Sequence, residues 1–170
     1  IDEECSQILA RRQPTASDLR LVVAVIKTIT DLERIGDQAE RIARMGIRLS
    51  EQERPKNGYH ELQNLGAHVA RMMHDTLDAF ARTDIEAAFR VAKEDLSLDK
   101  EYDGIMRQSL TFMMEDPRLI TRMLDVMWIA RAIERIGDHS KNICEYIIYL
   151  VKGKNVRHIS LDAIEQEIQE

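Results

Sequence analysis

Apolar residues recur every three to four positions along most of this 170-residue chain, which is the period of amphipathic helices. The pattern predicts long helices at residues 18–49, 59–82, 85–115 and 118–152. Residues 1–12 have the pattern of a helix in progress, and the last residues that of a short amphipathic or fraying tail. The predicted fold class is therefore all-α.

Proline, glycine and capping residues mark the predicted helix ends. Pro14 and Pro117 each end one helix and begin the next, because proline cannot donate the backbone hydrogen bond of a helix interior. Thr83 or Asp84 is expected to cap the helix that begins at residue 85. Gly153 is expected to stop the last long helix.

The sequence ERIGD occurs at residues 33–37 and again at 134–138, an offset of 101 residues, and the apolar pattern before both copies matches. Such a repeat predicts two related units of three helices each. The expected domains are 1–50 (the remainder of a first unit), 51–58 (a polar linker), 59–153 (a complete second unit) and 154–170 (a C-terminal tail). Because the first unit shows little more than its third helix, we expect a further N-terminal segment before Ile1.

Each ERIGD copy places acids beside an apolar stripe when its helix is drawn at about 100° per residue. In the first copy the stripe is predicted to comprise Val22, Val25, Ile29, Leu32, Gly36, Ala39 and Ala43. Glu33 and Asp37 lie at its edge. In the second copy the stripe is predicted to comprise Val126, Ile129, Ile133, Gly137, Ser140 and Cys144. Glu134 and Asp138 lie at the corresponding edge.

The middle helix of the second unit carries acids within its own apolar stripe. This stripe is predicted to comprise Ala88, Val91, Ala92, Tyr102, Met106, Leu110 and Met113. Asp95 and Asp99 fall near its middle, where they would face a neighbouring helix. An unpaired buried carboxylate is costly, so a cation or a shared proton is expected beside them.

Gly36 and Gly137 lie on the apolar stripes between the acids of each copy. A glycine within a helix costs about 1 kcal/mol relative to alanine, and its use there indicates close approach by a second helix.

Carboxylates from two facing helices are ligands that Mg²⁺, Mn²⁺ or iron accept. The candidate ligands of the second unit are Glu134, Asp138, Asp95 and Asp99, with Asn142 and Glu145 as outer members. The alternative is a structural role, in which the acids form salt bridges with residues such as Arg131 or Arg135 and bind no metal. A di-metal carboxylate enzyme is a further alternative, but the Glu-x-x-His pairs of such enzymes are missing from the sequence.

Composition narrows the remaining classes of function. The formal net charge is −6 and no basic stripe is interleaved with aromatic residues, which argues against nucleic-acid binding. The apolar run at 146–151 is much shorter than the roughly 20 residues of a membrane span. No stretch has the pattern of a secretory signal, and we expect a cytoplasmic protein. Cys5 and Cys144 lack metal-ligand spacing and are expected to be buried free thiols.

Over essentially its whole length the chain resembles the PhoU family of bacterial phosphate-uptake regulators. The doubled ERIGD, RRQPTASDLRLV at 11–22, HDTLDAFARTDIEAAFRVAKED at 74–95 and CEYIIYLVKG at 144–153 carry the resemblance. It implies two three-helix bundles related by pseudo-twofold symmetry, in a cytoplasmic homodimer. It also implies a non-enzymatic adaptor between the phosphate ABC transporter, through its ATPase subunit, and a membrane sensor histidine kinase. Membrane association would then be peripheral and through these partners.

The resemblance further implies that Glu33, Asp37, Glu134 and Asp138 are metal ligands of ExxxD motifs, and that Asp95 and Asp99 form the facing DxxxD motif. Two departures weaken the first site. Many members of the family have asparagine where Arg41 stands, and the second copy keeps it as Asn142. The DxxxD motif that would face Glu33 and Asp37 would lie before residue 1, so we expect metal to favour the second site.

Overall fold

The computed structural model describes residues 1–12, 15–52, 59–157 and 159–169, and within them it contains helices and no strand. The helices are α1 (Asp2–Arg12), α2 (Ala16–Ser50), α3 (His60–Arg82), α4 (Ile85–Glu115), the short 3₁₀ helix η1 (Pro117–Leu119), α5 (Ile120–Lys152) and α6 (Leu161–Gln169). The all-α prediction is confirmed, and the four long helices begin and end within two residues of their predicted bounds.

Local chemistry accounts for the helix ends. Thr83 closes α3 in the left-handed region, at φ 53°, and the Asp84 side chain accepts a hydrogen bond from Ala87 N, 2.9 Å away, at the start of α4. Asp84 is therefore the cap of α4. Gly153 ends α5 at φ 70°, a conformation that glycine adopts without strain. Pro14 lies outside the described residues, whereas Pro117 begins η1 as predicted.

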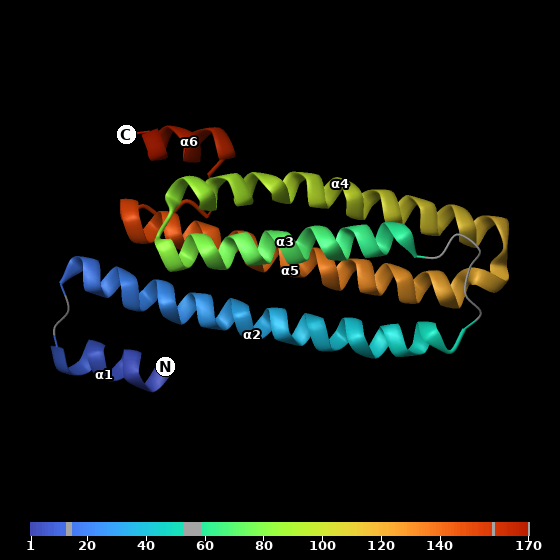
Figure 1. Ribbon diagram of the computed structural model, residues 1–170, viewed down its shortest axis with the longest axis horizontal. Coiled ribbons are helices and arrows are strands. Elements are labelled where there is room, and N and C mark those ends of the chain that lie inside the picture. Colours follow the sequence, from blue (N-terminus) through green and yellow to red (C-terminus); the bar gives the residue numbers. More distant parts are fainter. Residues whose placement is uncertain (13–14, 53–58, 158, 170) are drawn as a thin grey trace.

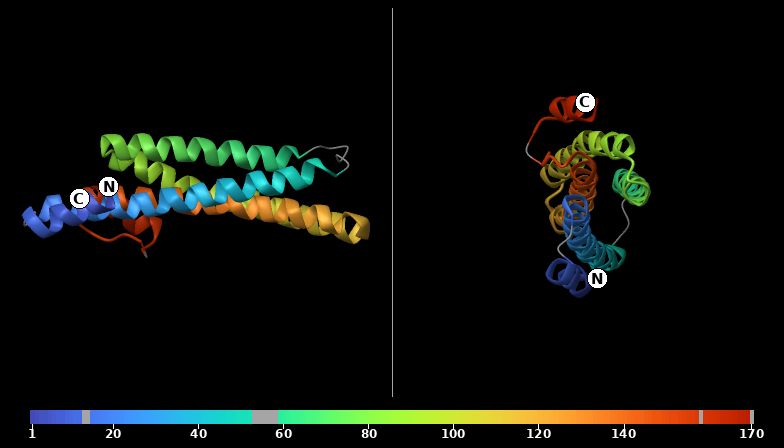
Figure 2. Two further views of the ribbon diagram at one scale, coloured as in Figure 1. Left: turned by 90° about the horizontal axis from the view of Figure 1, so that it is seen from below. Right: turned by 90° about the vertical axis from the view of Figure 1, so that its left-hand side faces the viewer.

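Helix α5 lies at the centre of the molecule (Figure 1). It packs against α3 and α4 on one side and against α2 on the other, as the end-on view of Figure 2 shows. Helices α2 and α5 run in opposite directions, and their contact is the most extensive between any two helices described. The third helices of the two repeat units therefore form the seam of the fold.

Two buried aspartates tie this seam together. Midway along α2, Asp31 bonds to three side chains of α5. Near the C-terminal end of α2, Arg48 forms an ion pair with the buried Asp125 of α5, and Gln52 Nε2 donates to the same carboxylate over 3.2 Å. Polar contacts with fixed partners pin the register of two helices more tightly than apolar packing alone.

Helix α6 packs against the outer side of α4. Ile164 of α6 is buried in a small cluster with Phe89 of α4, Ile148 of α5 and Val156 of the connecting segment. Lys93 Nζ forms an ion pair with Glu165 Oε1 at 3.1 Å. The predicted tail is thus an amphipathic helix docked on the bundle.

The predicted apolar stripe is confirmed for α5 and only in part for α4 and α2. All six predicted positions of α5 are buried. In α4, Leu110 is exposed. In α2, the buried positions are Val22, Ala24, Thr28, Asp31 and Leu49, whereas the predicted positions from Gly36 onward are exposed. Both faces of α2 carry apolar residues, and the helix turns toward α5 the face that includes Asp31.

The two ERIGD glycines have different surroundings. A Cβ atom on Gly137 would lie 2.1 Å from Leu98 Cδ2 and 3.6 Å from Val69 Cγ2, so α4 approaches α5 as closely as predicted. A Cβ atom on Gly36 would meet no described atom within 4 Å. Only the second copy therefore makes the predicted close contact within the described chain.

Alanine substitutions are expected to have opposite effects at these glycines. Gly36→Ala should raise the free energy of unfolding by about 1 kcal/mol, because alanine favours the helix and meets no neighbour. Gly137→Ala should lower it by about 1–2 kcal/mol, because the buried Leu98 must move in a packed core. Urea unfolding of both variants beside the unsubstituted chain would test this, and two changes of the same sign would contradict it.

No helix within the described ranges has the length and apolarity that crossing a membrane requires. Cys5 and Cys144 are both buried and free, as predicted, and burial raises the pKa of the Cys144 thiol to about 12.

Candidate functional site

The close contact of α4 and α5 at Gly137 brings the predicted carboxylates of the second unit together. Asp95 and Asp99 lie one turn apart on α4, and Glu134 and Asp138 lie one turn apart on α5. Asp95 is 3% exposed and Glu134 is 7% exposed. Asp99 is half-buried, and Asp138 lies at the solvent-facing edge. These four residues are called the carboxylate cluster below.

Two basic residues of α5 contact the cluster. Lys141 Nζ lies 2.6 Å from Asp95 Oδ2, and Arg131 Nη1 donates to Glu134 Oε1 over 2.7 Å. The second oxygen of each acid, Asp95 Oδ1 and Glu134 Oε2, is buried and has no hydrogen-bond partner among the described residues. Each acid is therefore only half satisfied.

The electrostatics show that the four carboxylates share one environment. Burial, with the nearby Asp138 carboxylate adding to it, raises the pKa of Glu134 to about 7, although Arg131 opposes the rise. Loss of solvent contact and the charge of Asp95 raise the pKa of both Asp99 and Asp138. Mutual repulsion of this kind identifies a site that a further cation would stabilise.

The carboxylate cluster has the donor atoms that a hard cation requires. Its described side chains are not arranged so that three of them could hold one ion. Carboxylate oxygens suit Mg²⁺, Mn²⁺ and iron, and two buried oxygens lack partners. No three His, Cys, Asp or Glu side chains in the described ranges converge closely enough to hold a metal ion as they stand. A metal bound by Asp95 Oδ2 would have to displace Lys141, which contacts that oxygen.

The two predicted outer members, Glu145 and Asn142, have different environments on α5. Glu145 is 7% exposed, and burial raises its pKa to about 7 against the opposing charge of Lys141. Its Oε2 atom is buried without a described partner, as in the cluster. Asn142 instead donates from Nδ2 to Asp31 Oδ1 over 3.3 Å, so its side chain is directed toward α2.

The predicted ligands of the first unit are apart from the cluster. Glu33 and Asp37 are exposed on α2, and neither forms an ion pair or hydrogen bond with a residue that the structure describes. Within these residues the first copy of the motif thus has no facing carboxylates.

Sequence reasoning missed Asp31, which is 2% exposed on α2. Its Oδ1 atom lies 2.7 Å from His139 Nδ1, and its Oδ2 atom accepts from Tyr146 Oη over 2.8 Å. The signal was a break in the repeat, because the second copy has Ala132 at the position of Asp31.

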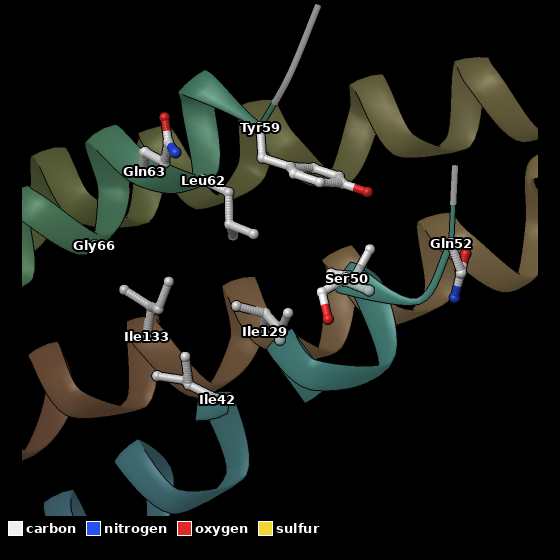
Figure 3. A pocket seen from close by; sticks show the side chains of 11 residues that line it. Ile42, Ser50, Gln52, Tyr59, Leu62, Gln63, Gly66, Ile129 and Ile133 are labelled. Carbon is white, nitrogen blue, oxygen red and sulfur yellow. The ribbon is translucent and has the colours of Figure 1, made fainter. Parts of the chain in front are cut away.

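An apolar cavity of about 580 Å³ lies between α2, α3 and α5 (Figure 3), and none of the four residues of the carboxylate cluster lines it. Ile42, Leu62, Ile129 and Ile133 point into it, and Gly66 of α3 leaves room on its wall. Its lining includes no Asp, Glu, His or Cys, so it offers a metal none of these ligands.

A family model described as the PhoU domain matches residues 1–45 and 62–147. The chain is 50% identical over 169 residues to the phosphate-specific transport system accessory protein PhoU homolog of Pseudomonas aeruginosa, covering 99% of this chain and 70% of that protein. It is 52% identical over 167 residues to the phosphate-specific transport system accessory protein PhoU of Escherichia coli K12, covering 98% of this chain and 68% of that protein.

Two solved structures of PhoU proteins have the same fold as this chain. The crystal structure of PhoU from Pseudomonas aeruginosa superposes with a TM-score of 0.87 at 51% identity, over 90% of this chain and 73% of that one. The phosphate transport system regulatory protein PhoU from Streptococcus pneumoniae superposes with a TM-score of 0.82 at 30% identity, over 91% of this chain and 72% of that one. The matched family model, the relatives and the two-bundle fold together place this chain in the PhoU family.

Proposed function

We propose that the chain is a non-enzymatic regulator of a phosphate transport system. The observation that carries this proposal is the identity of about half over nearly the whole chain to proteins named as accessory proteins of phosphate-specific transport. The described helices supply a long seam and a carboxylate cluster, which suit a protein that acts by binding.

The proposed partners are the ATPase subunit of the phosphate ABC transporter and a sensor histidine kinase, joined by this protein as a cytoplasmic homodimer. Pull-down of each partner with the purified chain, with and without phosphate in the buffer, tests this proposal. Retention of both partners supports an adaptor. Retention of neither, by a folded chain of defined oligomeric state, would contradict it.

The carboxylate cluster is proposed to bind a divalent or trivalent metal, with Mg²⁺, Mn²⁺ and iron as the candidates. Asp95, Asp99, Glu134 and Asp138 would supply the oxygens, with Glu145 nearby, and the ion would neutralise their repulsion. The partnerless oxygens Asp95 Oδ1 and Glu134 Oε2 support this proposal. The ion would join α4 to α5 and so couple metal binding to stability.

We expect Mn²⁺ to stabilise the chain through this cluster. At 100 times its dissociation constant, a bound ion should raise the free energy of unfolding by about 2.7 kcal/mol. The D95N/D99N variant should lose most of this gain, whereas E33Q/D37N should keep it, because the second site is the complete one. Urea unfolding with Mn²⁺ or EDTA measures the effect.

Two outcomes would count against this metal site. Equal loss of the Mn²⁺ effect in the two double variants would contradict a preference for the second unit. No Mn²⁺ effect at all, in a chain whose acids still contribute to stability in EDTA, would favour the alternative of purely structural salt bridges.

A further inference from the structure

A second cavity, which is polar and has a volume of about 370 Å³, lies at the seam between α2 and α5. Three segments form its walls: α2, α5 and the connection between α5 and α6. It is lined by Arg34, Arg135, Asp138, His139, Lys141, Asn142, Glu145 and Arg157. Cationic side chains therefore outnumber acidic ones by four to two, in a chain whose formal net charge is −6.

Two of these cations are the same residue of the repeated motif. Arg34 and Arg135 are the arginines of the two ERIGD copies, and each follows the glutamate of its copy. Because α2 and α5 are antiparallel and pack along the motifs, both arginines reach one cavity. The repeat thus duplicates a guanidinium across the seam as well as duplicating the acids.

Neither arginine is paired with an acid among the described residues. Arg34 and Arg135 are exposed, and their side chains form no ion pair or hydrogen bond with the described residues. By contrast, Arg48 and Arg131 on the same two helices are paired with acids. Two free guanidinium groups facing one cavity offer the planar donor geometry that binds tetrahedral oxyanions.

The wall of the cavity also carries an imidazole that is held on one side by an aspartate. His139 is about nine-tenths buried, and its Nδ1 atom is held by Asp31 Oδ1 at 2.7 Å. Its Nε2 atom has no hydrogen-bond partner among the described residues, and the imidazole lines the cavity. Asp31 also accepts hydrogen bonds from Asn142 Nδ2 and Tyr146 Oη. These bonds fix the position of Asp31 beside the His139 wall of the cavity.

The two acids that line the cavity, Asp138 and Glu145, have other charged neighbours on α4 and α5. Asp138 is part of the carboxylate cluster, and Glu145 lies near Lys141, whose ammonium group contacts Asp95. At about 100° per residue, Asp138 and Glu145 lie roughly 60–80° round α5 from Arg135, and His139 lies on the other side of Arg135. Arg135 and His139, with Arg34 of α2, are therefore taken as the anion-binding part of the cavity.

We propose that this cavity binds a small tetrahedral oxyanion of the phosphate type, held by Arg34 and Arg135 from the two helices, with the imidazole of His139 on the wall between them. The bound oxyanion would bridge α2 and α5, and hence the two repeat units. The site goes beyond the proposed regulatory function and needs no metal.

Calorimetric titration of the purified chain with inorganic phosphate tests the proposal. EDTA excludes phosphate bridged by metal, and chloride holds the ionic strength constant. We expect saturable binding of one phosphate per chain. Arg34→Gln and Arg135→Gln should each weaken it about tenfold, because each removes a charge-assisted donor. Arg107→Gln, which removes an exposed arginine of α4, is the matched control and should bind as the unsubstituted chain does.

Circular dichroism and urea unfolding should show that the Arg34→Gln and Arg135→Gln variants remain folded, since neither arginine has a polar partner among the described residues. Equal phosphate affinity in all four proteins would overturn the proposal, as would no binding by the unsubstituted chain. Arginine-dependent binding to vesicles of phosphatidylglycerol and phosphatidylcholine, without binding of free phosphate, would also overturn it in favour of a lipid headgroup. The metal proposal would stand in each case, because its test uses different residues and Mn²⁺.

Discussion

Replacing Asp31 by alanine is expected to lower the free energy of unfolding by about 3 kcal/mol, the range measured when a buried polar network loses its central member. Asp31 is nearly fully buried and bonds to His139, Asn142 and Tyr146 of α5. Its removal leaves these groups without an acceptor and opens a gap in the most extensive helix contact of the fold. Urea unfolding in EDTA measures the change.

Asp37→Ala is the matched control for Asp31→Ala. It removes the same charged group from the same helix, but Asp37 is exposed and has no partner in the described chain. We expect a change within about 0.5 kcal/mol, as for ordinary surface positions. A similar loss in both variants would show that α2 is weakened by helix propensity or net charge. The buried network would then not be the cause.

Glu145→Gln is expected to stabilise the metal-free chain at pH 8 by about 2–3 kcal/mol and to have little effect at pH 4.5. Burial raises the pKa of Glu145 to about 7 in the folded chain, against an ordinary value of 4.5. Between these values the folded state binds more protons than the unfolded state, so stability falls as pH rises. A shift of this size corresponds to roughly 3 kcal/mol at most. Glutamine keeps the shape of the neutral acid and has no such penalty.

Unfolding in EDTA from pH 4.5 to pH 8 provides the measurement, and the exposed Glu33→Gln is its control. The stabilities of the control and the unsubstituted chain should remain parallel across this range. The gain of Glu145→Gln over the unsubstituted chain should grow through the window and level off above about pH 7. A gain that is constant with pH would mean that Glu145 is ionised throughout, and it would exclude titration as the source.

Much of the carboxylate site could be predicted because its elements are local and repeated. The doubled motif identified the third helices of the two units, and the position of Gly137 between Glu134 and Asp138 predicted a close neighbour. The 2.1 Å separation between a Cβ atom on Gly137 and Leu98 Cδ2 confirms that neighbour. The sequence could not predict that Lys141 is the counter-ion of Asp95. A long side chain at the edge of a helix can turn toward several partners.

Helix periods, capping residues and the repeat by themselves determined which segments are helical and where they end, because these signals act within a few residues. They also determined the apolar stripe of α5, all six predicted positions of which are buried. Only the tertiary structure decided which face of α2 is buried, because α2 has apolar residues on two sides and the choice depends on α5, some hundred residues away. The same choice buried Asp31 against His139 and brought Arg34 beside Arg135, since both contacts exist only when the two helices pack in antiparallel register.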